Sequence, residues 1–283
     1  MNYRHAYHAG NFADVIKHIV LSRVIVHLRE KPAAFRIIDT HAGTGKTNLS
    51  GAEASRTGEW RNGIGRIFDA AFTPNVESLL QPYLDAIKQF NPRGNLLIYP
   101  GSPMLALSLM RAQDRLLACE LEPVAAAALT KQLRTDKRAK AVTIDGWTAL
   151  SAYVPPVERR GAVLVDPPFE QPGELDRLAE GLADAYRKWT TGTYLLWYPI
   201  KNPREIDAFA RKITKLAIPK VLRIEAMVHE PRDIDRLNGT GLIAVNPPWM
   251  LESELSMLLP PLASAMADNG RSGFRVDWLT REK

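Results

Sequence analysis

The chain has 283 residues, of which 46% are hydrophobic and 24% charged, and it contains a single cysteine, Cys119. This composition excludes a disordered protein and any internal disulfide, and a lone cysteine is typical of a reducing compartment. No run approaches the roughly 20 apolar residues of a membrane span, and the N-terminus lacks the apolar core of a signal peptide. A formal charge of +6 mildly favours a polyanionic partner. We therefore expect a globular cytoplasmic protein without membrane contact.

The first predicted element is an amphipathic helix over residues 12 to about 30, where apolar residues from Val15 to Leu28 recur at helical spacing. Four short apolar runs then follow, each ending in an acid. They end at Asp39, Glu120, Asp145 and Asp166. Helix-like segments at about 122–134 and 147–153 separate the later runs, and this alternation predicts a parallel, doubly wound sheet.

Three more strands are predicted at about 193–198, 220–228 and 241–245. The last two are joined without a long apolar helix, so they can pair as an antiparallel hairpin. The layout predicts an α/β chain with the seven-stranded, mostly parallel sheet of the Rossmann-like methyltransferases.

One interval is too long for this layout. About 80 residues separate Asp39 from Glu120, whereas about 25 and 21 separate the later acids. Residues from about 52 to 93 show mainly helical spacing of apolar side chains. We predict a single domain over 1–283 with a small helical subdomain inserted at about 52–93.

Acids at strand ends point to a ligand site, because open α/β sheets bind ligands at the carboxyl ends of their strands. A carboxylate after the second strand can accept both hydroxyl protons of a ribose, which is the role expected for Glu120. Asp145 and Gly146 would then lie near an adenine ring. The four acids in order, with the glycine turn after Asp39, indicate a site for a nucleoside-bearing cofactor.

The glycine turn has a competing interpretation. Gly43-Thr44-Gly45-Lys46-Thr47 resembles the end of a phosphate-binding P-loop. That motif also needs a glycine five residues before the Gly-Lys pair, where this chain has Thr40. The loop is also too short to wrap a phosphate, which favours the nucleoside interpretation.

Asp166-Pro167-Pro168-Phe169 carries the most specific chemistry in the chain. The lone pair of an adenine N6 amine is delocalised into the ring, so the amine is a poor nucleophile. Asp166 and the carbonyl of Pro167 can accept its two N–H bonds, and the prolines stiffen the turn that holds these acceptors. Phe169 can stack on the base, which is worth about 1–3 kcal/mol. The alternative is a tight turn without chemistry.

A second proline pair follows the predicted seventh strand, at Asn246-Pro247-Pro248-Trp249. Its place in the series of strands predicts a structural or peripheral role. Loosely grouped basic residues could contact RNA or simply face solvent. They are Arg56, Arg61 and Arg66 in the insertion, and Arg232 and Arg236 before the last strand.

The first eleven residues are dense in aromatic and imidazole side chains, including Tyr3, His5, Tyr7 and His8. No carboxylate or cysteine stands at metal-ligand spacing, so no metal is expected. We predict a mobile tail over 1–11 that covers the cofactor site and touches RNA. His18 and His41, taken alone, are more typical of surface positions than of ligands.

These motifs together resemble the RlmJ family of 23S rRNA adenine-N6 methyltransferases, and the similarity runs essentially from end to end. The stretches that carry it are Tyr3-Arg4-His5, His8-Ala9-Gly10-Asn11, Ala13-Asp14-Val15, Lys17-His18, Asp39-Thr40-His41-Ala42-Gly43, Tyr99-Pro100-Gly101-Ser102-Pro103, Asp145-Gly146, Asp166-Pro167-Pro168-Phe169, Gly192-Thr193-Tyr194, Trp197-Tyr198-Pro199 and Asn246-Pro247-Pro248-Trp249. The family often has Tyr where this chain has Phe169. Stacking survives that change. The glycine turn also varies at Thr44 and Lys46, which leaves the contacts of these two residues open.

The resemblance implies S-adenosylmethionine as cofactor, an inserted helical subdomain, and a specific adenine of 23S rRNA as substrate. It assigns Asp166, Pro167 and Phe169 to catalysis, and Tyr3 with Phe169 to the substrate RNA. Cofactor binding falls on His18, His41, Ser102, Glu120, Asp145, Gly146 and Asp166. The expected partner is free or early-assembly 23S rRNA, bound by a monomer without metal. A methyltransferase for DNA adenine or a protein side-chain amide, and a non-catalytic RNA-binding assembly factor, are the alternatives.

Overall fold

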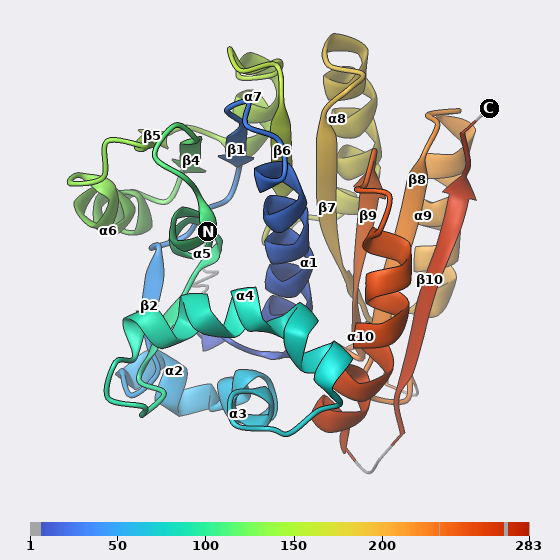
Figure 1. The fold of residues 1–283 in the computed structure, drawn as a ribbon. Helices are drawn as coiled ribbons and strands as arrows, with labels where there is room; N and C mark the ends of the chain where they lie inside the picture. Colours follow the sequence, from blue (N-terminus) through green and yellow to red (C-terminus); the bar gives the residue numbers. More distant parts are fainter. Residues whose placement is uncertain (1–6, 232, 269–270, 283) are drawn as a thin grey trace.

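A mixed β-sheet organises the computed structural model, which describes residues 7–231, 233–268 and 271–282 (Figure 1). Within these residues eight strands form the sheet in the order β10-β8-β9-β7-β6-β1-β4-β5. The strands are β1 (Arg36–Asp39), β4 (Arg115–Glu120), β5 (Ala139–Thr143), β6 (Gly161–Val165), β7 (Thr193–Ile200), β8 (Val221–Met227), β9 (Gly239–Val245) and β10 (Gly273–Thr280).

The five neighbouring strands β5, β4, β1, β6 and β7 run parallel. The predicted hairpin of β8 and β9 is confirmed as an antiparallel pair, and β9 also pairs antiparallel with β7. Seven strands match the predicted ones. The eighth, β10, lies antiparallel to β8 at the edge of the sheet and was not predicted. Apolar and charged residues alternate from Phe274 to Trp278, as in a strand, but the side chains of β10 are mostly not buried.

Side chains alternate between the two faces of each strand, and helices bury both faces. Ile37 belongs to one core with α1 (Phe12–Arg29), α4 (Pro74–Phe90), α5 (Ser102–Leu109), α6 (Pro123–Leu133) and α10 (Leu251–Met266). Ile38, the next residue, belongs to a second core with α7 (Gly146–Ala152), α8 (Glu174–Lys188) and α9 (Pro203–Lys215). Both cores are continuous along the sheet, so the carboxyl ends of the strands are held in fixed positions.

Local sequence explains where several of these helices begin. Asn11 accepts hydrogen bonds from the first-turn N–H groups of α1, and Glu122 does the same for α6. Pro123 and Pro203 occupy first-turn positions of α6 and α9, where a missing N–H costs nothing.

The long interval between β1 and β4 holds most of the remaining elements. They are β2 (Lys46–Asn48), α2 (Ala52–Thr57), the 3-10 helix η2 (Glu59–Asn62), α3 (Ile64–Ile67), α4 (Pro74–Phe90) and β3 (Ile98–Pro100). The short strands β2 and β3, which were not predicted, pair antiparallel on either side of the helical stretch. Figure 1 shows α2, α3 and α4 gathered at one end of the molecule. Among the helices of the described residues, none combines the length and apolar character needed to cross a membrane.

Candidate active site

A cavity of about 440 Å³ opens at the carboxyl ends of the parallel strands. Six of the residues predicted from the sequence line it, although they come from five separate parts of the chain. They are His41, Ser102, Glu120, Asp145, Gly146 and Asp166. The topology therefore brings the acids at the strand ends to one place, as parallel strands require.

Glu120 stands at the end of β4 with its carboxylate held by main-chain N–H groups. One oxygen, Oε2, accepts from Gly43 at 2.8 Å, and the other accepts from Leu121 at 2.8 Å and Glu122 at 2.9 Å. Gly43 has a φ of 59°, a conformation that glycine adopts without strain. A carboxylate has about four acceptor positions. Three are filled here, so capacity for a ligand hydroxyl remains on Oε2.

Asp39, at the end of β1, is buried and accepts a hydrogen bond from the Ser102 hydroxyl at 2.6 Å. Burial raises the pKa of Asp39 to about 7, against the Ser102 hydrogen bond, which lowers it. Ser102 begins α5 and lines the cavity, so this buried pair sits directly behind its wall.

His41 lies in the turn after β1 and is fixed by its neighbours. Its Nδ1 lies 2.8 Å from the hydroxyl of Thr40, which itself donates to the carbonyl oxygen of Leu164 at 3.1 Å. Because the hydroxyl proton is used in that way, Nδ1 of His41 is assigned as the donor and Nε2 remains an acceptor. Burial lowers the pKa of His41 to about 4, so the ring is neutral at pH 7.

Gly146 and Asp145 place the start of α7 against this histidine. A Cβ on Gly146 would lie 2.5 Å from two ring atoms of His41 and from the carbonyl oxygen of Thr40. Only glycine therefore permits the approach. Asp145 caps α7 through Thr148, whose N–H donates to Oδ2 at 2.9 Å. Its other oxygen, Oδ1, makes no hydrogen bond within the described residues.

Asp166 follows β6 and pairs with Lys17 of α1. The Lys17 ammonium also contacts Asp14 at 2.8 Å, and all three side chains are largely buried. Burial alone would lower the pKa of Lys17, but the two carboxylates raise it above its ordinary value. Lys17 also lies 5.7 Å from the centre of the Trp197 ring. The ion pair engages Oδ2 of Asp166 and leaves Oδ1 without a hydrogen bond within the described residues.

The rest of the Asp-Pro-Pro-Phe turn is held from behind. Pro167 is buried, and Pro168 lines the cavity. Phe169 packs edge-on against Trp197 at 5.5 Å and has a φ of 53°, which is unusual for a bulky residue. Glu174 also lines the cavity, and burial raises the pKa of its carboxyl group. Such strained conformations cluster at functional sites.

Three of the predicted residues that the structure describes, His18, Pro167 and Phe169, do not line the cavity. His18 is buried beneath it and hydrogen-bonds the hydroxyl of Tyr99 at 2.8 Å. Tyr99 itself lines the cavity, so this contact connects His18 to the site. Pro167 and Phe169 stand on either side of the lining Pro168. Tyr3 lies outside the described residues.

The second proline pair lies at the amino ends of the parallel strands, on the side opposite the cavity. Asn246 follows β9, which runs antiparallel to β7, so it stands beside the start of β7. Its side-chain amide donates to the carbonyl oxygens of Thr190 and Gly192, and Trp249 is exposed. The expected structural role agrees with these contacts.

The basic residues singled out from the sequence have different kinds of partner in the structure. Arg66 and Arg236 both pair with Asp268, Arg61 lies over the ring of Trp60, and Arg232 is outside the described residues. Within the described residues, no group of three His, Cys, Asp or Glu side chains is arranged to hold a metal ion.

Sequence reasoning missed Lys17 and Glu174. Lys17 left a signal, because it is a cation inside an apolar helix, three residues after Asp14. Its partner Asp166 is 149 residues away, so the pairing itself was invisible. Glu174 left none, since an acid in the first turn of a helix is ordinary.

Comparisons with known proteins show which family the chain belongs to. A protein-family model described as "Ribosomal RNA large subunit methyltransferase D, RlmJ" matches residues 32–280. Ribosomal RNA large subunit methyltransferase J of Escherichia coli (strain K12) is 39% identical over 282 residues, with 100% of both chains covered. The protein of the same name from Haemophilus influenzae is 36% identical over 283 residues, again covering 100% of both chains. A crystal structure of a Legionella pneumophila protein has a TM-score of 0.86 at 34% identity and covers 95% of this chain and 98% of its own. The chain belongs to the family of ribosomal RNA large subunit methyltransferase J, RlmJ.

Proposed function

We propose that this protein transfers a methyl group from S-adenosylmethionine to the N6 amine of a specific adenine in 23S rRNA. Family membership makes it a ribosomal RNA large subunit methyltransferase with an S-adenosylmethionine-dependent fold. The choice of an adenine amine rests on the turn from Asp166 to Phe169. The observation that carries it is the Asp166 carboxylate, which faces the cavity with one oxygen tied to Lys17.

The residues of the cavity fit the cofactor. Glu120 has acceptor capacity for a ribose hydroxyl, and Asp145 with Gly146 would lie beside the adenine ring. Ser102 and His41 line the same cavity, and the buried Asp39 accepts a hydrogen bond from Ser102 behind the cavity wall. When bound, S-adenosylmethionine supplies an electrophilic methyl group. A neutral His41 does not repel a positively charged sulfonium as an imidazolium would, and carboxylates such as Asp166 line the same cavity.

The chain's own groups would orient the base. Asp166 Oδ1 accepts one N6–H, and the carbonyl of Pro167 accepts the other, which directs the nitrogen lone pair out of conjugation. Lys17 fixes the carboxylate through Oδ2, so little reorganisation is needed when the base arrives. Phe169 stacks on the base, with its ring oriented by Trp197.

In this proposal the chain acts as one methyltransferase domain, with residues 52–93 as its inserted helical part. Residues 1–11 cover the cavity. Ala9 lines the cavity, and His8 pairs with Glu59 of the inserted part at 3.0 Å, which would start the tail beside the site. The substrate is free or early-assembly 23S rRNA, with Tyr3 among its contacts. A cytoplasmic monomer carries out the reaction.

The test is transfer of labelled methyl from S-adenosylmethionine to unmodified 23S rRNA, with duplex DNA in parallel. We expect N6-methyladenosine in RNA alone, and its loss in Asp166→Ala. The matched control is Asn246→Ala, which alters the other proline turn and should keep turnover in the folded protein. Label in DNA would favour a DNA adenine methyltransferase. Absence of cofactor uptake by calorimetry would favour a non-catalytic RNA-binding protein.

A further inference from the structure

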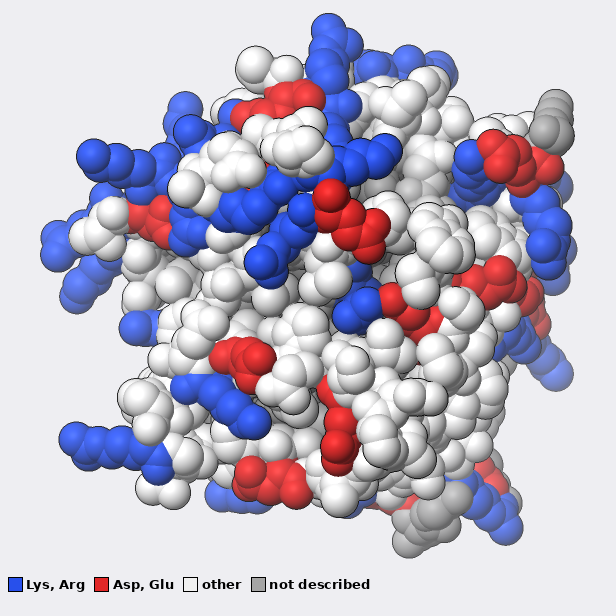
Figure 2. All heavy atoms as spheres, viewed as in Figure 1, with Lys and Arg blue, Asp and Glu red and all other residues white. Residues whose placement is uncertain are grey.

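The amino ends of the parallel strands, which lie opposite the cavity, carry a dense basic surface. We call it the amino-edge surface and define it by residues 29–36, 111–115, 131–140 and 158–160. These segments end α1 and α6 and begin β1, β4, β5 and β6. The strand starts lie side by side, since Arg36 is in register with Arg115 and Gly161. Figure 2 shows Lys and Arg side chains gathered over the α6 side of the molecule and the end of α1.

The positive charge of the chain is concentrated there. The four segments contain 12 Lys and Arg and 4 Asp and Glu, an excess of 8 positive charges. The whole chain has an excess of only 6. Everything outside the amino-edge surface is therefore net negative by 2. The net positive charge of the chain therefore comes from this surface, which favours it as a site for a polyanion.

Some of these cations have structural partners. Arg36 pairs with Glu158, Arg138 with Asp136 and Arg111 with Asp114. Arg115 and Arg160 donate to main-chain carbonyl oxygens. Seven others are exposed and have no carboxylate partner within the described residues. They are Arg29, Lys31, Lys131, Arg134, Lys137, Lys140 and Arg159.

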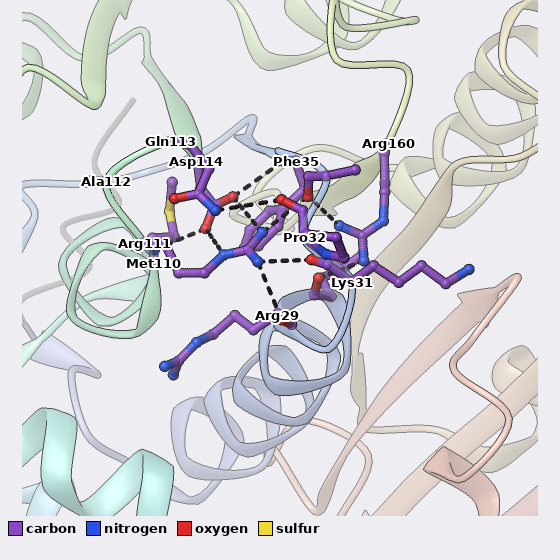
Figure 3. Close-up of polar contacts among 12 residues, drawn as sticks. Arg29, Lys31, Pro32, Phe35, Met110, Arg111, Ala112, Gln113, Asp114 and Arg160 are labelled. Carbon is purple, nitrogen blue, oxygen red and sulfur yellow. Dashed lines mark hydrogen bonds and ion pairs between the residues drawn. The ribbon is translucent and has the colours of Figure 1, made fainter.

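Hydrogen bonds hold the backbone around Arg29 and Lys31, two of these seven cations (Figure 3). Arg111 and Arg160 both lie over the ring of Phe35, at 5.5 and 5.8 Å. Their guanidinium groups donate to carbonyl oxygens at the end of α1 and in the loop after it, those of Leu28, Arg29, Lys31 and Ala33. A partner that binds here would order few main-chain atoms, which lowers the entropic cost of binding.

Helix ends alone do not account for the pattern. The C-terminus of a helix favours cations, which explains Arg29, Lys131 and Arg134 at the ends of α1 and α6. Lys137, Lys140 and Arg159 stand in or before strands, where no helix dipole rewards a positive charge. Unpaired like charges at short range repel one another, so a bound polyanion would relieve a cost that the free protein carries.

We infer that the amino-edge surface binds phosphates of the substrate RNA at a distance from the target adenine. The inference rests on the proposed function, which supplies the RNA. Strands of four to six residues separate this surface from the cavity, or about 13–20 Å at about 3.3 Å per residue. The RNA must therefore extend beyond the target nucleotide and around the edge of the molecule.

The test replaces Lys131, Arg134, Lys137 and Lys140 together by Gln. The matched control replaces four exposed cations at or near α9, Lys201, Arg204, Arg211 and Lys215, which also have no carboxylate partner within the described residues. Affinity for transcribed 23S rRNA is measured by filter binding over a series of salt concentrations, alongside KM, kcat and cofactor affinity. Melting temperatures check that both variants fold.

We expect the amino-edge variant to bind RNA roughly tenfold or more weakly, with KM raised in parallel. The slope of log affinity against log salt should fall by about 0.7–0.9 for each phosphate contact removed. The kcat at saturating RNA and the affinity for the cofactor should not change, and the α9 control should behave as the wild type.

Equal losses of RNA affinity in the two variants would overturn the inference, because the effect would then depend on the net charge of the protein and not on the position of the cations. Unchanged RNA affinity and salt slope in the amino-edge variant would overturn it as well. Failure of the proposed function looks different. In that case the wild-type protein transfers no label to RNA, while the binding comparison still decides whether this surface contacts it.

Discussion

The two edges of the sheet hold side chains of opposite charge, and they hold them with opposite main-chain groups. At the carboxyl edge Glu120 accepts from the N–H groups of Gly43, Leu121 and Glu122. At the amino edge Arg111 donates to three carbonyl oxygens of the segment that ends α1. For Glu120 and Arg111 the sign of the side chain follows the polarity of the backbone groups around it, whereas Asp114 at the amino edge accepts from the N–H groups of Phe35 and Arg111.

The cause lies in the parallel strands and the helices that follow them. Each such helix begins at the carboxyl edge, where its first N–H groups lack partners, and ends at the amino edge, where its last carbonyls lack them. Acids gather at the first edge and arginines at the second. At the carboxyl edge the acids and Lys17 are largely buried around a cavity, whereas the cations of the amino edge are mostly exposed. We therefore expect substitutions at the first edge to have larger effects.

The largest effect is expected for Lys17→Met. This change leaves Asp14 and Asp166 buried without their shared cation, which should reduce the free energy of unfolding by about 3–5 kcal/mol. Urea unfolding at pH 7 measures it. A loss below about 1 kcal/mol would show that the carboxyl edge tolerates charge as well as the amino edge does.

Asp39→Asn tests the buried carboxyl through pH. The folded-state pKa of Asp39 is raised to about 7 from 3.8, so its stabilising contribution is present at low pH and lost as pH rises from about 4 to 7. Asn keeps an acceptor for Ser102 but does not ionise. Relative to wild type, the variant should gain up to about 4 kcal/mol between these pH values. Parallel pH profiles of unfolding free energy would contradict the assignment.

Gly146→Ala should weaken cofactor binding about tenfold or more. The new Cβ would displace the His41 ring, and such overpacking costs about 1–3 kcal/mol. Calorimetric titration with S-adenosylmethionine measures the change. Gly273→Ala, where a Cβ meets only the Cβ of Met227 at 3.8 Å, is the control and should bind the cofactor normally. Equal affinities of the two variants for S-adenosylmethionine would show that Gly146 does not contribute to cofactor binding.

The smallest effect is expected for Arg36→Met at the amino edge. Its pair with Glu158 is partly exposed, with side-chain accessibilities of 26% and 13%. Water and salt screen such pairs, so we expect a loss of about 1 kcal/mol or less. Urea unfolding beside Lys17→Met gives the ratio of the two effects. A loss as large as that of Lys17→Met would erase the difference between the edges.

Much of the site was accessible from sequence patterns. Asp39, Glu120, Asp145 and Asp166 each end an apolar run, and parallel strands must bring such ends together. The order of the strands also separated Asp166 from Asn246, because Asn246 follows the predicted seventh strand. Strand order did not find Lys17 as the partner of Asp166. The family resemblance assigned His18 to the cofactor, and in the structure His18 hydrogen-bonds Tyr99, which lines the cavity.

Periodicity and motif spacing by themselves determined the strand ends, the first helix, the helical character of residues 52–93 and the Asp-Pro-Pro-Phe turn. These features depend on neighbours close in sequence, where apolar spacing and proline act directly. Only the tertiary structure decided the rest. It paired β10 with β8, set Lys17 between two carboxylates, and joined four separate segments into one basic surface. Each of these depends on residues far apart in the chain, and their charges interact only because the fold brings them together.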